Sequence, residues 1–177
     1  MKNIRLIGIS GSLREQSSNT AILRTIETLL PTEVGFEIYD QLHLIPPFIP
    51  GEEETDAIKD FKKRISNADG VFFSTPEYAF GVPGVLKNLL DWTVSTGEFN
   101  EKPVSVISAS PLYTGGEHAL SSLLLTLTAL GTTRNEHSAL SIPDIKTKLS
   151  KENDLTHPET IQQLQDQIKN LLKIIAG

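Results

Sequence analysis

The 177-residue chain contains no cysteine and no long uninterrupted run of apolar residues. The missing cysteine excludes disulfides, thiol nucleophiles, iron–sulfur clusters and cysteine-based zinc sites. The missing apolar run argues against a membrane-spanning helix. Basic residues are in the minority, because 16 Lys and Arg against 22 Asp and Glu give a net charge of −6. Nucleic-acid binders usually carry a basic face, and anionic membranes attract basic segments, so we expect neither partner.

Several common motifs are also absent. There is no GxxxxGK[ST] sequence, which argues against a nucleoside triphosphatase, and no GxGxxG after the first predicted strand, which argues against a dinucleotide-binding domain. The four His residues lack the spacing of a metal site such as HExxH, so we expect no bound metal. The amino end runs straight into a predicted strand. We therefore expect no signal peptide and a cytoplasmic location.

Strand and helix signals alternate along the chain, which predicts a single domain over residues 1–177. Apolar and β-branched runs indicate strands at residues 4–9, 35–39, 70–75 and 103–108, with a short fifth strand within 132–140. Apolar residues at helical spacing indicate helices at residues 20–30, 57–67, 83–92, 119–130 and 158–175. This order predicts an α/β fold, namely a flavodoxin-like, doubly wound parallel sheet of five strands in the order 2-1-3-4-5 with helices on both faces. The remaining long segments are a proline-rich loop at 44–51 and an irregular stretch at 142–156.

Residues 10–19 join the first predicted strand to the first predicted helix and are rich in hydroxyl groups. A phosphate group needs many donors in a concave arrangement, and backbone N–H groups at a helix start, with Ser and Thr hydroxyls, supply them. The loop also contains one cation, whose guanidinium can pair with a phosphate. An ordinary serine-rich turn with a helix cap fits the same residues. The candidate phosphate ligands are Ser10, Ser12, Arg14, Ser17, Ser18 and Asn19.

Residues 76–84 follow the third predicted strand and read PEYAFGVPG. Pro and Gly bend and stiffen this loop, so that backbone groups can face a planar ligand, and Tyr78 and Phe80 offer apolar surface. The carboxyl ends of parallel strands meet at one edge of a sheet, so we expect this loop to lie beside residues 10–19. Together the two loops predict a site for flavin mononucleotide (FMN), which has both a phosphate and a planar ring.

In these loops and in the segments beside them, the chain resembles the NADPH-dependent FMN reductase family, which includes quinone, azo and chromate reductases. The resemblance lies in GSLR at 11–14 with the following Ser17, Ser18 and Asn19, in PEY at 76–78, in PGVLKN at 83–88 and in DW at 91–92, with a looser match at 108–110 and 115–116. These segments are spread over about the first three quarters of the chain. The resemblance implies a flavodoxin-like fold, tightly bound FMN and a homodimer or homotetramer.

The resemblance also implies which residues bind the cofactor. Residues 10–19 would hold the phosphate, the second loop would line the isoalloxazine, and a third loop would approach it. The implied residues of the second loop are Pro76, Glu77, Tyr78, Ala79 and Phe80, and those of the third are Ser108, Ser110 and Gly115. The chain departs from the family pattern at two places: Ala79 stands where the family commonly has Asn, and Pro-Leu-Tyr at 111–113 replaces a more glycine-rich sequence.

The sequence thus predicts an FMN-dependent NAD(P)H oxidoreductase. Its partners would be NADPH or NADH and a small-molecule acceptor, such as a quinone, an azo compound, a flavin or a metal oxyanion, with hydride passing through the bound FMN. Because the flavin performs the chemistry, we expect no catalytic side chain. Two other functions use the same loops: a flavodoxin-type electron carrier and a non-enzymatic FMN-binding regulatory protein. Carriers usually have an aromatic and acidic loop in place of PEYAFGVPG, whereas Ala79 is the one feature that points to a regulatory protein.

Overall fold

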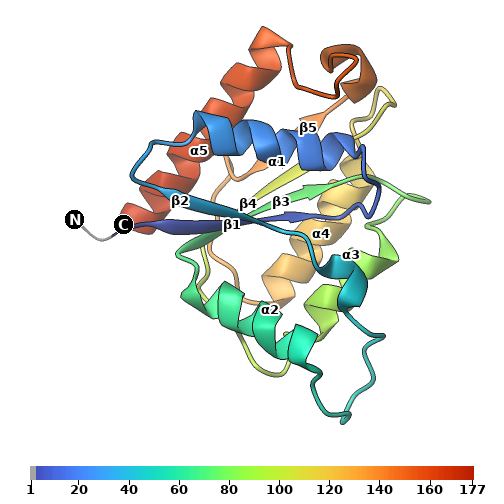
Figure 1. Ribbon diagram of the computed structural model, residues 1–177, viewed down its shortest axis with the longest axis vertical. Coiled ribbons are helices and arrows are strands. Elements are labelled where there is room, and N and C mark those ends of the chain that lie inside the picture. The colour runs from blue at the N-terminus through green and yellow to red at the C-terminus, as the bar shows by residue number, and fades with distance from the viewer. Residues whose placement is uncertain (1–2) are drawn as a thin grey trace.

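The computed structural model describes residues 3–177, which form one five-stranded parallel sheet with helices on both faces (Figure 1). The strands are β1 (Arg5–Ser10), β2 (Gly35–Tyr39), β3 (Gly70–Thr75), β4 (Val104–Ala109) and β5 (Ala139–Ile142). The helices are α1 (Ser18–Leu29), α2 (Asp56–Asn67), α3 (Gly84–Asp91), α4 (Glu117–Ala129) and α5 (Pro158–Ala176), with short 3-10 turns at Leu42–Leu44 and Ile145–Lys148. The strand order β2-β1-β3-β4-β5 confirms the predicted flavodoxin-like topology.

The two faces of the sheet are covered by different helices (Figure 1). Helices α1 and α5 pack on one face, where Ile22 and Ile168 join a buried cluster with Phe72 of β3. Helices α2, α3 and α4 pack on the other face, where Leu89 joins a second cluster with Phe73 of the same strand. The consecutive residues Phe72 and Phe73 point to opposite faces, as the two-residue period of a strand requires. Because both faces are covered, the central strands are continuous apolar runs that can be recognised in the sequence.

The register of the sheet brings the carboxyl ends of the central strands to one edge. Ser10 of β1 is paired with Ser74 of β3, and Thr75 is paired with Ser108 of β4. The loops after these strands therefore start at the same level. The direction of winding reverses between β1 and β3, and ligands of open α/β sheets bind in the crevice beside such a reversal.

The fifth strand starts later than the sequence predicts. Strand β5 covers Ala139–Ile142, whereas the expected strand lies within 132–140. The Asn135–Ser138 segment forms a turn, in which Ser138 N–H donates to Asn135 O and Asn135 N–H donates to Ser138 Oγ, both at 3.1 Å. This turn separates an isolated parallel bridge between Thr133 and Pro103 from the strand itself, whose ladder with β4 starts at Ala139, opposite Val106.

Helix α3 fixes the proline-rich loop that follows β2. The side chains of Asn88 (Nδ2) and Trp92 (Nε1) both donate to Pro46 O, at 2.8 and 3.0 Å. Phe48 N–H donates to Asn88 Oδ1 at 2.7 Å, and its ring meets the Trp92 ring edge to face at 5.1 Å. The Asn and Trp of the motif PGVLKNLLDW therefore order a neighbouring loop.

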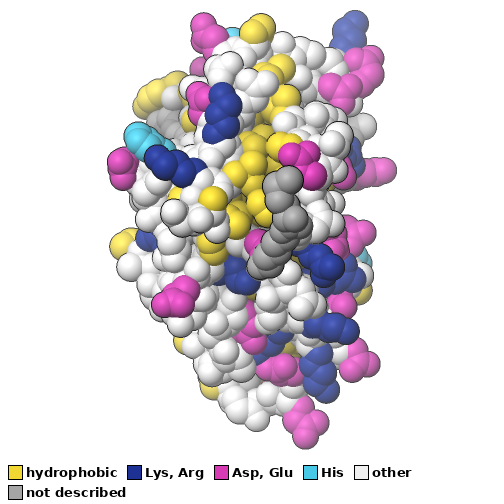
Figure 2. All heavy atoms as spheres, turned by 90° about the vertical axis from the view of Figure 1, so that its left-hand side faces the viewer, with side chains coloured by type: hydrophobic (Ala, Val, Ile, Leu, Met, Phe, Trp, Pro, Cys, Tyr) yellow, Lys and Arg dark blue, Asp and Glu magenta, His cyan; other side chains and the backbone are white. Residues whose placement is uncertain are grey.

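The opposite edge of the sheet, where the strands begin, carries charges of both signs around a strip of apolar side chains (Figure 2). A hollow of about 620 Å³ lies here, and its lining includes Arg5, Asp69, Glu101 and Lys102. It is larger than the cavity at the carboxyl edge, but parallel α/β sheets bind their ligands at the carboxyl ends of the strands. Among the helices of residues 3–177, none combines the length and apolar character needed to cross a membrane.

Candidate functional site

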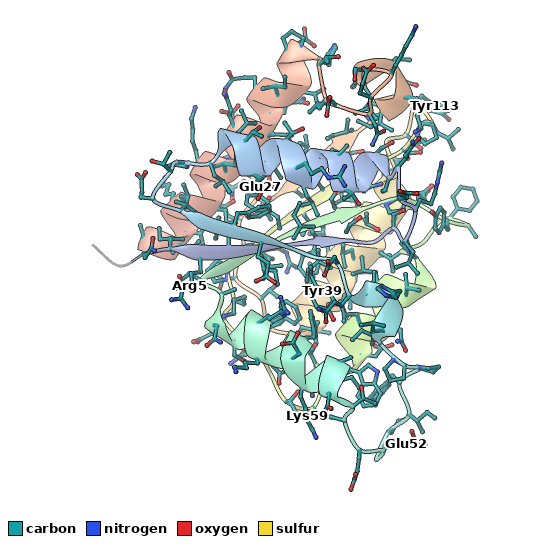
Figure 3. All side chains as sticks on the ribbon, viewed as in Figure 1. Arg5, Glu27, Tyr39, Glu52, Lys59 and Tyr113 are labelled. Atoms are coloured by element: carbon teal, nitrogen blue, oxygen red, sulfur yellow. The ribbon has the colours of Figure 1, made fainter. Side chains whose placement is uncertain are left out.

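A cavity of about 330 Å³ opens at the carboxyl edge of the sheet. Its walls come from the segments that follow β1, β3, β4 and β5, so four stretches far apart in the sequence meet here. In Figure 3, Tyr113 marks this edge of the molecule and Arg5 marks the opposite one. The lining residues are Ser12, Arg14, Ser17, Ser18, Asn19, Pro76, Glu77, Tyr78, Ala109, Ser110, Pro111, Leu112, Ile145 and Lys146.

The loop between β1 and α1 is held in shape by its own side chains. Ser17 is the N-cap of α1, and its hydroxyl accepts hydrogen bonds from the N–H groups of Asn19 at 3.2 Å and Thr20 at 3.4 Å. The buried Ser10 hydroxyl accepts hydrogen bonds from Ser12 N–H at 3.3 Å and from the Thr20 hydroxyl at 3.0 Å. These bonds all lie within the loop and the first turn of α1.

Asn19 connects this loop to the neighbouring strands. Its buried side chain accepts a hydrogen bond from the Ser74 hydroxyl at 2.9 Å, and its amide donates to Ala109 O at 3.5 Å. Gly11 N–H donates to Ser74 O at 2.8 Å. A Cβ on Gly11 would lie 2.8 Å from Thr75 Oγ1, so glycine is needed for the chain to leave β1 this close to β3.

Hydrogen-bond donors and positive charge gather at the amino end of α1. Ser18 N–H, in the first turn, has no acceptor within residues 3–177. Arg14 and Lys146 line the same cavity, and neither forms an ion pair with any residue that the structure describes. In a chain of net charge −6, two unpaired cations beside a helix start favour an anionic ligand.

The loop after β3 contains a two-residue turn. Tyr78 N–H donates to Gly81 O, and Gly81 N–H donates to Tyr78 O, both at 3.0 Å. The central residues Ala79 and Phe80 have φ angles of 49° and 61°. Positive φ at both central positions is the requirement of a type I′ turn, which strongly prefers Asn and Gly. Asn at position 79 would satisfy this preference, whereas Ala79 adopts the conformation at a cost.

The loop after β4 is held from behind by two serine hydroxyls. Ser108 Oγ donates to Gly115 O at 2.8 Å, and Ser141 Oγ donates to Thr114 O at 3.2 Å. Gly115 has a φ of 65°, and a Cβ there would collide with Ser141 Oγ. The loop therefore depends on glycine at this position.

Large apolar side chains surround the mouth of the cavity. On one side Tyr78 and Phe80 are 51% and 75% exposed, and on the other Leu112 and Tyr113 are 59% and 83% exposed. The Phe80 ring meets the His118 ring edge to face, with centroids 5.0 Å apart. Exposed apolar groups beside a cavity indicate a binding surface.

The fourth wall, which follows β5, was missed by the sequence analysis. Ile145 N–H donates to Ser110 O at 3.0 Å and Asp144 N–H donates to Leu112 O at 3.2 Å, so this segment is fixed to the loop after β4. These bonds bring Lys146 to the cavity. The sequence position of Lys146, just after the last strand, could have indicated this wall, because that strand also ends at the ligand-binding edge.

The structure brings nine of the fourteen predicted cofactor residues into the wall of this cavity. They are Ser12, Arg14, Ser17, Ser18, Asn19, Pro76, Glu77, Tyr78 and Ser110. Ser10, Ser108 and Gly115 lie behind the wall and brace it through the hydrogen bonds described above. Ala79 and Phe80 form the exposed tip of the turn.

These features define an α/β protein of the flavodoxin-like class, with a helix-start N–H and two cations, unpaired among the described residues, at one cavity and apolar side chains at its mouth. Within residues 3–177, no group of three or more His, Asp or Glu side chains is placed to hold a metal ion. A family model described as NADPH-dependent FMN reductase matches residues 4–147. The chain therefore belongs to the NADPH-dependent FMN reductase family, whose members are oxidoreductases that use FMN and a reduced nicotinamide.

Individual relatives agree with this assignment. The chain is 36% identical over 113 residues to an NAD(P)H-dependent FMN reductase of Pseudomonas aeruginosa, and the match covers 61% of this chain and 60% of that protein. It is 34% identical over 127 residues to a quinone reductase of Pseudomonas putida, covering 67% and 68% of the two chains. The solved structure of FerB, a flavoenzyme NAD(P)H:acceptor oxidoreductase from Paracoccus denitrificans, is similar with a TM-score of 0.87 over 98% of this chain and 97% of that chain. At 24% identity, this last likeness shows the fold alone.

We expect Ala79→Asn to raise the free energy of unfolding by about 1 kcal/mol, because Asn tolerates the left-handed conformation that the turn requires. As the matched control, Ala79→Val should lower it by about 1 kcal/mol or more, because a β-branched residue with positive φ is strongly disfavoured. Equilibrium urea unfolding of the flavin-free protein measures both changes. Equal stability of all three proteins would show that the turn does not have positive φ at position 79.

Proposed function

We propose that this chain is an FMN-dependent NAD(P)H oxidoreductase that reduces small organic acceptors. The observation that carries the proposal is the cavity at the carboxyl edge, in which a helix-start loop with unpaired donors faces a turn-containing loop with apolar side chains. Membership of the family supports the cofactor and the electron donor. Because the matched relatives are covered only in part, we propose the activity for this chain instead of transferring it from them.

The lining residues fit FMN. Its phosphate would be held at the start of α1 by Ser18 N–H, the Ser12 hydroxyl and Arg14, with Lys146 on the opposite side. Its ring system would lie against Tyr78 and the apolar residues of the facing loops. The chemistry that FMN supplies when bound is acceptance of a hydride from a nicotinamide and donation of electrons to a second substrate.

The residues of this chain would bind and orient the reactants. The preformed loops reduce the ordering that binding requires, and orientation of the reactants is the main contribution expected from the protein. The exposed Tyr78 and Leu112 leave the mouth open to planar substrates, which would use it in turn. The names of the two bacterial relatives point to quinones and flavins as acceptors.

The proposal is tested by incubating the purified protein with FMN, removing free flavin and recording an absorbance spectrum before and after anaerobic addition of NADPH or NADH. We expect the protein to retain FMN, the flavin bands to bleach with at least one nicotinamide, and a quinone to restore them. Free FMN with the same nicotinamide is the control. Retained FMN that responds to neither nicotinamide would overturn the reductase and favour a carrier or regulatory protein, whereas failure to retain FMN would overturn the cofactor assignment.

Arg14→Ala should raise the Kd for FMN by about tenfold, and Lys146→Ala by about threefold, because each removes a charge-assisted contact from an exposed position. Neither change should alter the Kd for riboflavin, which lacks the phosphate. Quenching of flavin fluorescence by the flavin-free protein measures both constants. Lys148→Ala is the control, since Lys148 does not line the cavity. Equal losses for FMN and riboflavin would show that these cations do not bind the phosphate.

We further propose that the chain forms a homodimer or homotetramer through the outer face of α4. This helix has no Asp, Glu, Lys or Arg after Glu117, and Leu125 on it is 73% exposed. Surface helices usually carry charges on the outer face, whereas the cores of interfaces are depleted of charge.

Leu125→Glu should raise the dissociation constant of the oligomer by about tenfold or more, because it buries a charge in the proposed interface. Sedimentation equilibrium measures the change, with Gln163→Glu on the exposed surface of α5 as the control for added charge. A monomeric wild-type protein at all concentrations would overturn the assembly. An unaffected oligomer in Leu125→Glu would place the interface elsewhere.

A further inference from the structure

The start of α4 is capped by a residue from another loop. The preceding residue, Gly116, has a φ of 82° and no side chain to accept a hydrogen bond. The first N–H groups of a helix have no acceptor within the helix. Here Glu77 Oε2 accepts the N–H of His118 at 2.9 Å and the N–H of Ala119 at 3.0 Å. A carboxylate suits this position because the amino end of a helix carries partial positive charge.

The Glu77 carboxylate thereby joins two walls of the cavity. Glu77 itself belongs to the loop after β3 and lines the cavity. Helix α4 continues directly from the loop after β4, which forms the facing wall and is anchored through Ser108. The edge-to-face contact between Phe80 and His118 is a second link between the same two segments.

The loop that Glu77 holds is under conformational strain. The two hydrogen bonds between Tyr78 and Gly81 close the turn, but they lie inside the loop and do not attach it to the sheet or the helices. The positive φ angles at Ala79 and Phe80 disfavour this conformation. Contacts from outside the turn must therefore hold it in place, and the two bonds to Glu77 are of the stronger, charge-assisted kind.

We propose that Glu77 is a positioning residue for the flavin ring: by holding the loop after β3 on the amino end of α4, it fixes Tyr78 relative to the facing wall of the cavity. The inference rests on the proposed FMN-binding function. It assigns Glu77 no contact with reacting atoms. Its action passes through the backbone of its own loop, so it concerns the ring end of the ligand and not the phosphate end.

The test compares Glu77→Ala with wild type in the flavin-free protein and in flavin binding. Amide hydrogen exchange, followed by NMR, should show that His118 and Ala119 lose protection in Glu77→Ala. The Kd values for FMN and for riboflavin should both rise by about tenfold, because the defect lies on the ring side. Glu77→Gln keeps an acceptor oxygen without the charge, so it should raise both Kd values by about threefold, and it also serves if Glu77→Ala fails to fold.

Two controls separate positioning from simple loss of a helix cap. His157→Ala removes the N-cap of α5, whose side chain accepts Thr160 N–H, and Glu117→Gln removes a charge from the first turn of α4 that forms no bond to the loop after β3. Both should leave the affinities for the two flavins unchanged.

Three results would overturn the inference. Unchanged protection of the two amides in Glu77→Ala would show that the link is absent. Lost protection with unchanged flavin affinity would show that Glu77 only caps the helix, and the proposed function would stand. A wild-type protein that binds neither flavin would overturn the proposed function and the inference together.

Discussion

From β1 the chain crosses to β2 on one side and then returns to β3 on the other side, so the direction of winding reverses at β1. The cavity lies beside this reversal. Right-handed crossovers require α1 to lie on one face of the sheet and α2 on the other, so neither helix covers the carboxyl ends of β1 and β3. The buried Asn19 side chain lies above these strand ends, where it forms hydrogen bonds with Ser74 of β3 and Ala109 of β4. The start of α1 is thus fixed in the wall of the cavity.

The residues around the cavity divide into those that form its wall and those that brace the wall. Arg14 and Lys146 face the cavity, whereas Ser10 and Ser108 bond to the loops from the side of the sheet. Glu77 does both, because it lines the cavity and caps α4. Such bracing favours one geometry of the wall, and a binding site gains affinity and orientation when its groups are held in place.

The sequence predicts the fold well because its central strands β1, β3 and β4 are buried on both faces and therefore read as continuous apolar runs. The loops after β1 and β3 were predictable for the same reason, since the strand ends locate them. The roles of single residues were less predictable, because they depend on partners distant in sequence. The Glu77 carboxylate accepts hydrogen bonds from N–H groups that lie 41 and 42 residues later in the sequence. Lys146 is brought to the cavity by backbone hydrogen bonds between its segment and the loop after β4. No local sequence pattern predicts these long-range contacts.

The left-handed conformation at Ala79 can be stabilised either by the preference of the residue itself or by tertiary contacts. With Asn at this position, the left-handed conformation would be favoured by the residue itself. With Ala79, the chain must hold that conformation from outside, and the bonds from α4 to Glu77 and the contact between the Phe80 and His118 rings are available for it. The conformation of this turn therefore depends more on its link to α4 than it would with Asn at position 79. Alanine at one exposed position thus makes the half-buried Glu77 carboxylate, two positions earlier, more important for the turn.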